Sequence, residues 1–171
     1  VRSFNVPAVI LRPFNTYGPR QSERAVISSI IRQVLDENIK AIKIGRLETK
    51  RDFNYVQDTV TAFISLAEAN KNKTDFGSAY NAGTGRAISI ENILKKIIKL
   101  TGSNKKIIQD RKRIRPSNSE VFNLVATSNK LNKLSGWKPD FTLEEGLKNT
   151  LDWWIERKKK NKLRISTDYA I

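Results

Sequence analysis

The sequence contains no cysteine and no histidine, and these two absences restrict the chemistry that it can support. Without cysteine there are no disulfides and no thiolate metal sites, a composition that fits the reducing cytoplasm, where we expect the protein. Without histidine the chain lacks the usual acid/base side chain at neutral pH and the commonest metal ligand. The carboxylates Asp52, Asp58 and Asp110 do not form a convincing metal cluster, so we predict no metal site.

Methionine and long apolar runs are also missing. The longest apolar stretches, such as Val6–Leu11, are far too short to span a bilayer, and because nothing in the sequence suggests export we expect no leader. We therefore expect no membrane contact. With 39% apolar and 29% charged residues, the 171 positions have the composition of one globular domain or part of a larger one. Because the chain lacks methionine and begins at Val1, we expect a fragment of a longer protein.

The net charge of +15 is the strongest signal in the composition. One interpretation is a nucleic-acid-binding module, because neutralising phosphates releases counterions and drives affinity. The other is a lysine-rich surface on a protein that handles an anionic ligand. The basic residues are scattered, and the one dense run, Arg157–Lys160, lies at a predicted helix end, where cations complement the helix dipole. We therefore do not expect nucleic acid as the main partner, although it stays the alternative from another functional class.

Strands and helices alternate along the chain, which predicts an α/β fold. The run Val6–Leu11 predicts a buried strand of a parallel sheet, and residues 24–37 have helical spacing. Residues 46–52 are expected to form a charged loop. The following helix, over 56–70, is predicted to bury one apolar face, made of Val60, Phe63, Ile64 and Ala67. The last helix is predicted to begin with a capping box at 142–145.

A polar segment follows the first predicted strand, Arg12–Arg20, at the place where open α/β sheets bind ligands. Its Asn15 can donate and accept hydrogen bonds, which suits sugar hydroxyls, or it can close its own turn. Tyr17 has no lysine partner at four-residue spacing, so we predict a structural role for it. Arginine side chains suit diphosphates because a guanidinium holds two oxygens at once. Three arginines are predicted in loops, where each alone could be a plain surface residue but together they indicate one anionic pocket: Arg24, Arg51 and Arg115.

Four motifs occur in a fixed order: Arg12–Arg20 (RPFNTYGPR), Arg51–Asp58 (RDFNYVQD), Tyr80–Gly83 (YNAG) and Leu134–Pro139 (LSGWKP). Together they resemble the carboxyl-terminal half of the extended short-chain dehydrogenase/reductase family, and within it the NAD-dependent nucleotide-sugar epimerases and dehydratases. The segment after Gly18 is most similar to UDP-N-acetylglucosamine 4,6-dehydratases of surface-polysaccharide or nonulosonic-acid synthesis. The resemblance covers nearly the whole chain.

The resemblance implies a fold and a set of binding residues. Residues 1–171 would hold the last part of a Rossmann-type parallel sheet, interleaved with a smaller mixed α/β domain that binds a nucleotide-diphosphate sugar. The amino-terminal NAD-binding half would be absent, and the whole protein would be a homodimer. Pro13 would border the nicotinamide end of NAD, and Asn118 departs from the acidic ribose contact that the family often has at this position. The implied substrate-binding residues are Asn15, Ala25, Val26, Ile44, Arg51, Arg115 and Asn118.

The resemblance also implies a reaction. In such enzymes a tyrosine deprotonates the sugar hydroxyl while NAD takes hydride from the same carbon, which gives a 4-keto intermediate. A 4,6-dehydratase then eliminates water and returns the hydride to C6, whereas a 4-epimerase returns it to C4. The glycine-rich loop and the Tyr-x-x-x-Lys pair do not occur in this sequence. We therefore predict no catalytic residue in this chain, which leaves dehydratase, epimerase and a non-catalytic sugar-nucleotide-binding domain open.

Overall fold

The computed structural model describes residues 3–114 and 116–162. Helices and short strands alternate through most of this range, which confirms the predicted α/β class. The strands are β1 (Ile10–Pro13), β2 (Thr16–Tyr17), β3 (Ala41–Ile44), β4 (Lys50–Asp52), β5 (Asn54–Tyr55), β6 (Ala79–Ala82), β7 (Ala87–Ser89), β8 (Lys106–Gln109) and β9 (Asn123–Leu124). The helices are α1 (Val26–Leu35), α2 (Val56–Ala67), α3 (Ile90–Thr101), α4 (Asn129–Ser135) and α5 (Leu143–Lys159), with 3-10 turns at Lys71–Lys73, Arg111–Arg113 and Ser117–Ser119.

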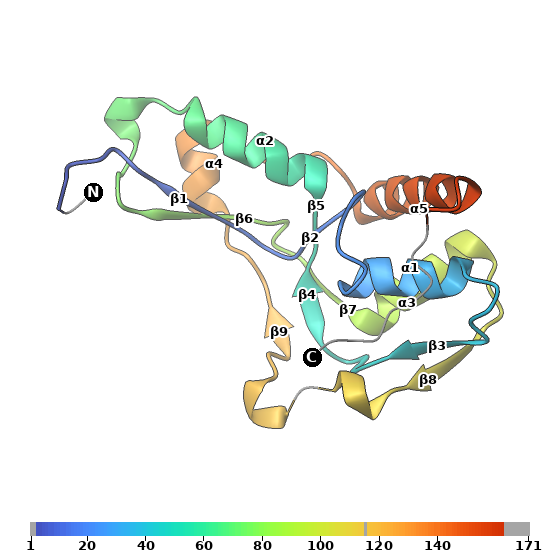
Figure 1. Cartoon of the computed structure of the whole chain (residues 1–171). Helices are drawn as coiled ribbons and strands as arrows, with labels where there is room; N and C mark the ends of the chain where they lie inside the picture. The colour runs from blue at the N-terminus through green and yellow to red at the C-terminus, as the bar shows by residue number, and fades with distance from the viewer. Residues whose placement is uncertain (1–2, 115, 163–171) are drawn as a thin grey trace.

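The strands form small sheets in which parallel pairing predominates. β1 pairs with β6, β2 with β5 and β3 with β8, all in parallel, while β4 lies between antiparallel β7 and parallel β9. Figure 1 shows β1 and β6 running beside α2 and α4 at one end of the molecule. Helices α1, α3 and α5 gather with β3 and β8 at the other end, and β4 lies between the two groups.

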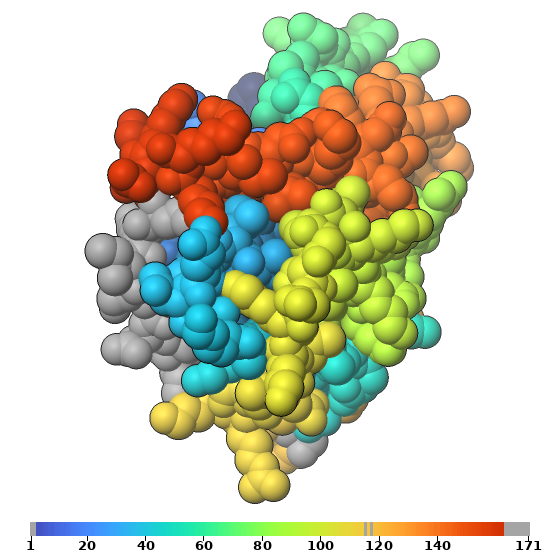
Figure 2. Space-filling model, turned by 90° about the vertical axis from the view of Figure 1, so that its right-hand side faces the viewer, coloured from blue at the N-terminus to red at the C-terminus, as the bar shows by residue number. Residues whose placement is uncertain are grey.

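Each group has its own apolar core. The larger core joins α1, α3 and α5 through side chains such as Ile31, Ile93 and Trp154, all at most 1% exposed. The smaller core joins β6, α2 and α4 around Tyr80 and Leu131. Figure 2 shows α5 as a continuous band across one face, above α3 and the loop that follows α1. The predicted capping box is confirmed, since the Thr142 and Glu145 side chains each bond the other residue's backbone N–H.

Several element predictions are wrong in detail. The first strand begins at Ile10 rather than Val6 and continues into the polar segment as far as Pro13, and Val6 and Ile10 are exposed. The predicted loop 46–52 contains β4, because its charged residues Lys50 and Arg51 pair with β7 and β9. Helix α1 is shorter than 24–37, since it begins after Ala25.

The buried face predicted for the helix after β5 is also wrong. α2 ends at Ala67, and Val60, Phe63 and Ile64 are all more than 40% exposed. The side chains that α2 buries are Asp58, Thr59, Ala62 and Leu66. A helical apolar pattern does not say which of two stripes meets the core. Here the stripe that contains polar residues packs inward. No residue among 3–114 and 116–162 buries the larger apolar stripe.

Candidate functional site

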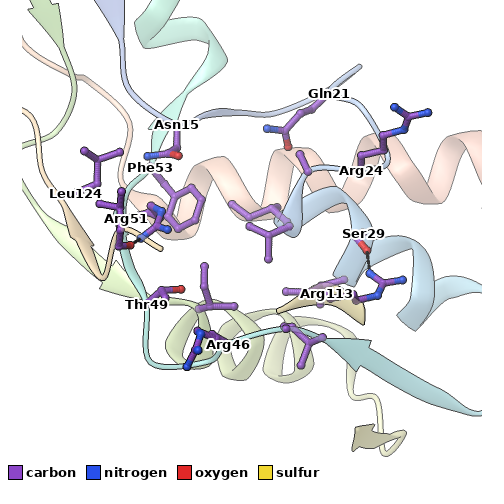
Figure 3. Close-up of a pocket in the computed structure, with 18 of the residues that line it drawn as sticks. Asn15, Gln21, Arg24, Ser29, Arg46, Thr49, Arg51, Phe53, Arg113 and Leu124 are labelled. Atoms are coloured by element: carbon purple, nitrogen blue, oxygen red, sulfur yellow. Dashed lines mark hydrogen bonds between the residues drawn. The ribbon is translucent and has the colours of Figure 1, made fainter. Parts of the chain in front are cut away.

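A cavity of about 450 Å³ lies between the start of α1, the ends of β3 and β4, and the segment around Arg113–Leu124. Figure 3 shows Arg51 and Phe53 on one side of this cavity, with Ser29 and Arg113 opposite them and Arg46 and Thr49 below. Its lining combines apolar, hydroxyl and charged side chains: Asn15, Thr16, Gln21, Arg24, Ala25, Val26, Ile27, Ser29, Ile30, Lys43, Ile44, Gly45, Arg46, Thr49, Arg51, Phe53, Ile90, Arg113, Glu120, Val121 and Leu124.

The first wall is the amino-terminal turn of α1. Ala25 is its N-cap, and no side chain caps the helix there. The first N–H groups of a helix have no partner within the helix, and the helix dipole makes this end positive. The loop before the helix is tied down through Gln21, which accepts a hydrogen bond from Ser28 Oγ at 3.1 Å and donates to the Thr16 carbonyl. Ser22 lies three residues before the N-cap Ala25, so its hydroxyl is not at the capping position.

The second wall is the end of β3, which the Gln33 side chain fixes against α1. Gln33 Oε1 accepts from the Lys43 backbone N–H at 2.7 Å, and its Nε2 donates to the Lys43 carbonyl at 3.1 Å. This pairing holds the end of β3 against α1, and Ile44 at that end lines the cavity. The next residue must be small, because a Cβ on Gly45 would lie 2.4 Å from the Arg113 carbonyl oxygen. Both residues line the cavity, so the close approach of these two backbones forms part of its wall.

The third wall is β4, whose position depends on the buried carboxylate of Asp52. Asp52 Oδ1 accepts from Thr84 N at 2.9 Å and Thr84 Oγ1 at 2.6 Å, and Oδ2 accepts from Gly85 N at 2.9 Å and Ala126 N at 3.1 Å. The side chain is fully buried. Asp52 thus joins β4 to the turn after β6 and to the segment before α4. The adjacent Gly83 is required by this packing, since a Cβ there would lie 2.5 Å from the Ala126 Cβ.

Arg51 presents its guanidinium to the cavity from β4. Its NH1 donates to the Lys50 carbonyl at 2.9 Å and also to the Val121 carbonyl, and its NH2 lies 2.9 Å from Glu120 Oε1. The Arg51 side chain is 15% exposed and that of Glu120 is 7% exposed. The pair therefore belongs to the cavity rather than to the open surface.

The charges that line the cavity are unbalanced. Five lining residues are cationic (Arg24, Lys43, Arg46, Arg51 and Arg113) and one is anionic (Glu120), an excess of four positive charges. Some of the cations have local partners. Arg113 Nε lies 3.5 Å from Asp110 Oδ2, and its NH1 donates to Ser29 Oγ at 3.2 Å. Arg46 NH1 lies 3.2 Å from Glu48 Oε1, and its guanidinium lies 5.7 Å from the centre of the Phe122 ring. The arrangement suits an anionic ligand with an apolar portion.

The structure brings together five of the predicted substrate-binding residues, since Asn15, Ala25, Val26, Ile44 and Arg51 all line the cavity. Asn15 does not close its own turn, because its Nδ2 donates to the Asp52 carbonyl at 3.1 Å across to β4.

Two other predicted binding residues do not line the cavity. Asn118 lies in the 3-10 turn Ser117–Ser119 and is absent from the lining. Pro13 ends β1, beside Ala82 of β6, and is also outside the cavity. Arg115 lies outside the described residues.

Sequence reasoning missed Thr49, Glu120 and the role of Arg113. Thr49 and Glu120 had no distinguishing neighbours in the sequence. Arg113 belongs to the same basic loop as Arg115, and two arginines in one proline-containing loop are a signal that could have included both.

Tyr17 has the structural role predicted for it. Its ring is 1% exposed, and its hydroxyl donates to the Leu143 carbonyl at 3.3 Å. Burial, together with Tyr55, Asp58 and Glu144, raises the pKa of the Tyr17 hydroxyl well above its ordinary value. A phenol held protonated in a core cannot serve as a general base.

Metal-binding and membrane-spanning features are both absent from residues 3–114 and 116–162. No group of three or more acidic side chains there could hold a metal ion. No helix within these ranges is long and apolar enough to cross a membrane.

The chain is similar to several known proteins. It is 28% identical to the GDP-6-deoxy-D-mannose reductase of Pseudomonas aeruginosa over 87% of this chain and 48% of that protein. It is 33% identical to the mouse dTDP-D-glucose 4,6-dehydratase over 88% of this chain and 42% of that protein. The structure of the Bacillus cereus UDP-glucuronic acid 4-epimerase, in complex with UDP-glucuronic acid and NAD, superposes with a TM-score of 0.80. It is 28% identical and covers 91% of this chain and 47% of that one.

The chain therefore spans about half the length of the relatives that it matches. Its sequence also matches the profile of one family over residues 1–150, which is most of its length. That family is described as GDP-mannose 4,6 dehydratase. Both the similar proteins and the four motifs agree with this assignment, and the mixed α/β fold with parallel pairing matches that of the related structures. The chain belongs to the GDP-mannose 4,6-dehydratase family, among the NAD-dependent epimerases and dehydratases of the extended short-chain dehydrogenases/reductases.

Proposed function

We propose that this chain is the nucleotide-sugar-binding half of an NAD-dependent nucleotide-sugar 4,6-dehydratase. The observation that carries the proposal is the cavity, which combines a group of arginines with an apolar, uncapped helix start. A nucleotide-diphosphate sugar has the matching parts, a doubly charged diphosphate and a flat base. In this arrangement Arg51 holds the diphosphate, and the base lies between Val26 and Ile44.

The substrate class follows from the family and from the charge of the cavity. Related structures were solved with UDP-glucose and UDP-glucuronic acid. The sequence segment after Gly18 favours UDP-N-acetylglucosamine as the sugar nucleotide and surface-polysaccharide or nonulosonic-acid synthesis as the setting. A 4-epimerase is the second candidate, because a related epimerase binds UDP-glucuronic acid and matches the same fold. The nucleotide-binding cavity serves either reaction equally well.

NAD fits this chain only at its edge. When bound, NAD supplies reversible hydride transfer at the sugar carbon. Pro13 ends β1 at the carboxyl edge of the parallel pair, where a nicotinamide would meet this half. The sequence has no glycine-rich turn for a pyrophosphate and no Tyr-x-x-x-Lys pair. We therefore propose that NAD is held mainly by the other half and that this chain alone is inactive.

The exposed apolar face of α2 is one reason to propose an NAD-binding half of the protein beside this chain. Val60, Phe63 and Ile64 form an exposed stripe, and β1 pairs with β6 along one edge only in the part of the chain that the structure describes. Parallel sheets in α/β proteins are normally buried on both faces. The relatives are about twice as long as this chain. An NAD-binding half that extends the β1–β6 sheet and covers α2 satisfies both observations.

The basic helix end gives little support to nucleic-acid binding. In the run Arg157–Lys160, Lys158 pairs with Glu37 and Lys159 pairs with Glu156, while Arg157 lies over the Trp153 ring. A nucleic-acid-binding surface would be expected to leave such cations available to phosphates. A filter-binding assay with DNA and RNA separates the two classes, because nucleic-acid binding would be tight and would weaken steeply with salt.

Isothermal titration calorimetry with UDP-glucose and UDP-N-acetylglucosamine tests the proposal. We expect binding that Arg51→Ala weakens by about tenfold to a hundredfold, because losing a charge-assisted hydrogen bond costs roughly 1.5–3 kcal/mol. Arg86→Ala is the matched control, since Arg86 is exposed and outside the cavity. Absence of binding, or equal losses in the two variants, would contradict the proposed site.

A further inference from the structure

The ion pair between Arg51 and Glu120 places an anion of the protein itself on the arginine that faces the cavity. The two side chains meet at 2.9 Å, and both are largely buried. Glu120 is the one acidic residue in the cavity lining. Its neighbours Val121 and Phe122 are about half exposed, whereas the Glu120 side chain is only 7% exposed. A carboxylate in this position occupies the Arg51 guanidinium, which an incoming anion would also use.

The donors of Arg51 leave little room for a second anion. NH1 already donates to two backbone carbonyls, those of Lys50 and Val121, and NH2 holds Glu120. A guanidinium grips an oxyanion with two adjacent N–H groups. If NH1 keeps its two carbonyl partners, an oxyanion that binds two adjacent N–H groups must use NH2. A phosphate that binds Arg51 in this way must share NH2 with the carboxylate or replace it, and like charges at this distance repel each other.

We propose that Glu120 is a built-in competitor for the anion site on Arg51 and that it sets how tightly this site holds a phosphorylated ligand. The proposal rests on the function proposed above and extends it to one further residue. In the unliganded protein the carboxylate keeps the arginine compensated and oriented. When a diphosphate binds, it takes over NH2, and Glu120 moves out beside its exposed neighbours. The cost of this exchange lowers the affinity for every diphosphate.

The segment around Glu120 is attached to β4, a wall of the cavity, through its backbone. Lys50 N donates to the Phe122 carbonyl at 2.8 Å, and β9 follows directly, paired in parallel with β4. The contacts of the guanidinium with this segment are the ion pair with Glu120 and the bond to the Val121 carbonyl. The backbone pairing between β4 and β9 can therefore persist while the carboxylate leaves, and no unfolding of this wall is needed.

Calorimetric titration of wild type and Glu120→Gln with UDP-glucose, and separately with inorganic pyrophosphate, tests this proposal. Glutamine keeps the shape and an acceptor oxygen but removes the charge. We expect both probes to bind Glu120→Gln about three- to tenfold more tightly than wild type, as expected for removing one competing ion pair. Glu48→Gln is the matched control, because Glu48 pairs with the cavity residue Arg46 but is itself exposed and outside the lining. Its affinity should stay within about twofold of wild type.

The titrations distinguish a failure of the Glu120 proposal from a failure of the proposed function. If wild type binds UDP-glucose through Arg51 but Glu120→Gln binds equally or more weakly, Glu120 only orients the arginine and the competitor proposal is wrong. If neither protein binds UDP-glucose or pyrophosphate, the proposed function itself fails, and this inference with it. Should Glu120→Gln fold poorly, as judged by its thermal midpoint, Glu120→Asp is used instead. It retracts the carboxylate by one methylene, and tighter binding is again expected.

Discussion

Asp52 is the residue whose replacement tests the architecture of the site most severely. Its buried carboxylate accepts four hydrogen bonds from three residues in two separate segments, and it directly follows Arg51 on β4. In Asp52→Asn one carboxylate oxygen becomes an amide nitrogen. That nitrogen faces N–H groups that have lost their acceptor, either those of Gly85 and Ala126 or the pair of donors from Thr84.

The size of the effect follows from these contacts. Hydrogen bonds to a charged group contribute roughly 1.5–3 kcal/mol each, and a buried donor without a partner costs about 1–3 kcal/mol. The amide still accepts from one side, so we expect Asp52→Asn to lower the free energy of unfolding by about 3–5 kcal/mol. For a chain of this length, 1 kcal/mol corresponds to roughly 2–4 °C, so the thermal midpoint should fall by about 6–20 °C.

Urea unfolding followed by circular dichroism measures this change, together with the thermal midpoint. Asp152→Asn is the matched control, because Asp152 is exposed on α5 and pairs only with Lys148. Its effect should stay below about 0.5 kcal/mol. A loss under about 1 kcal/mol in Asp52→Asn would refute the reasoning, because it would mean that the four contacts contribute no more than an exposed pair does.

Three further outcomes are expected. Gly45→Ala should lower the free energy of unfolding by about 1–3 kcal/mol in urea titration, because its Cβ would lie 2.4 Å from the Arg113 carbonyl oxygen. Tyr17→Phe should cost only about 0.5–1.5 kcal/mol by the same method and leave UDP-glucose affinity unchanged, because its hydroxyl bonds only a backbone carbonyl. Burial raises the pKa of Asp58 above its ordinary 3.8, so the folded state favours the protonated carboxyl. The free energy of unfolding of wild type, relative to that of Asp58→Asn, should therefore fall as the pH rises through the raised pKa. Urea titrations between about pH 3.5 and pH 7 check the sign, and a relative stability that rises with pH over this range would contradict it.

The fold class could be predicted from the sequence, but strand boundaries and buried faces could not. The alternation of apolar runs with helical spacing is a local signal, and it correctly indicated an α/β chain. β4 was missed because Lys50 and Arg51 are charged, and only pairing with β7 and β9 makes that segment a strand. The buried stripe of α2 was predicted wrongly for a related reason. Burial depends on which neighbours are present, and Phe63 faces away from all of those described.

The candidate site was predictable as far as its residues occur in motifs. Asn15 and Arg51 stand in recognisable segments, and both line the cavity. Glu120 carries no local signal, because an isolated glutamate in a basic loop usually faces solvent. Its importance arises from β4 and β9 lying side by side, a contact between residues about 70 positions apart. Asn118 was predicted from the family resemblance, and it lies in the turn Ser117–Ser119, outside the cavity lining.

A crystal structure of the protein in complex with UDP-glucose would show directly where the diphosphate binds. We expect the diphosphate within hydrogen-bond distance of Arg51, the uracil between Val26 and Ile44, and Glu120 no longer on the Arg51 guanidinium. A nucleotide bound outside this cavity, or bound in it with its phosphates away from Arg51, would contradict the account.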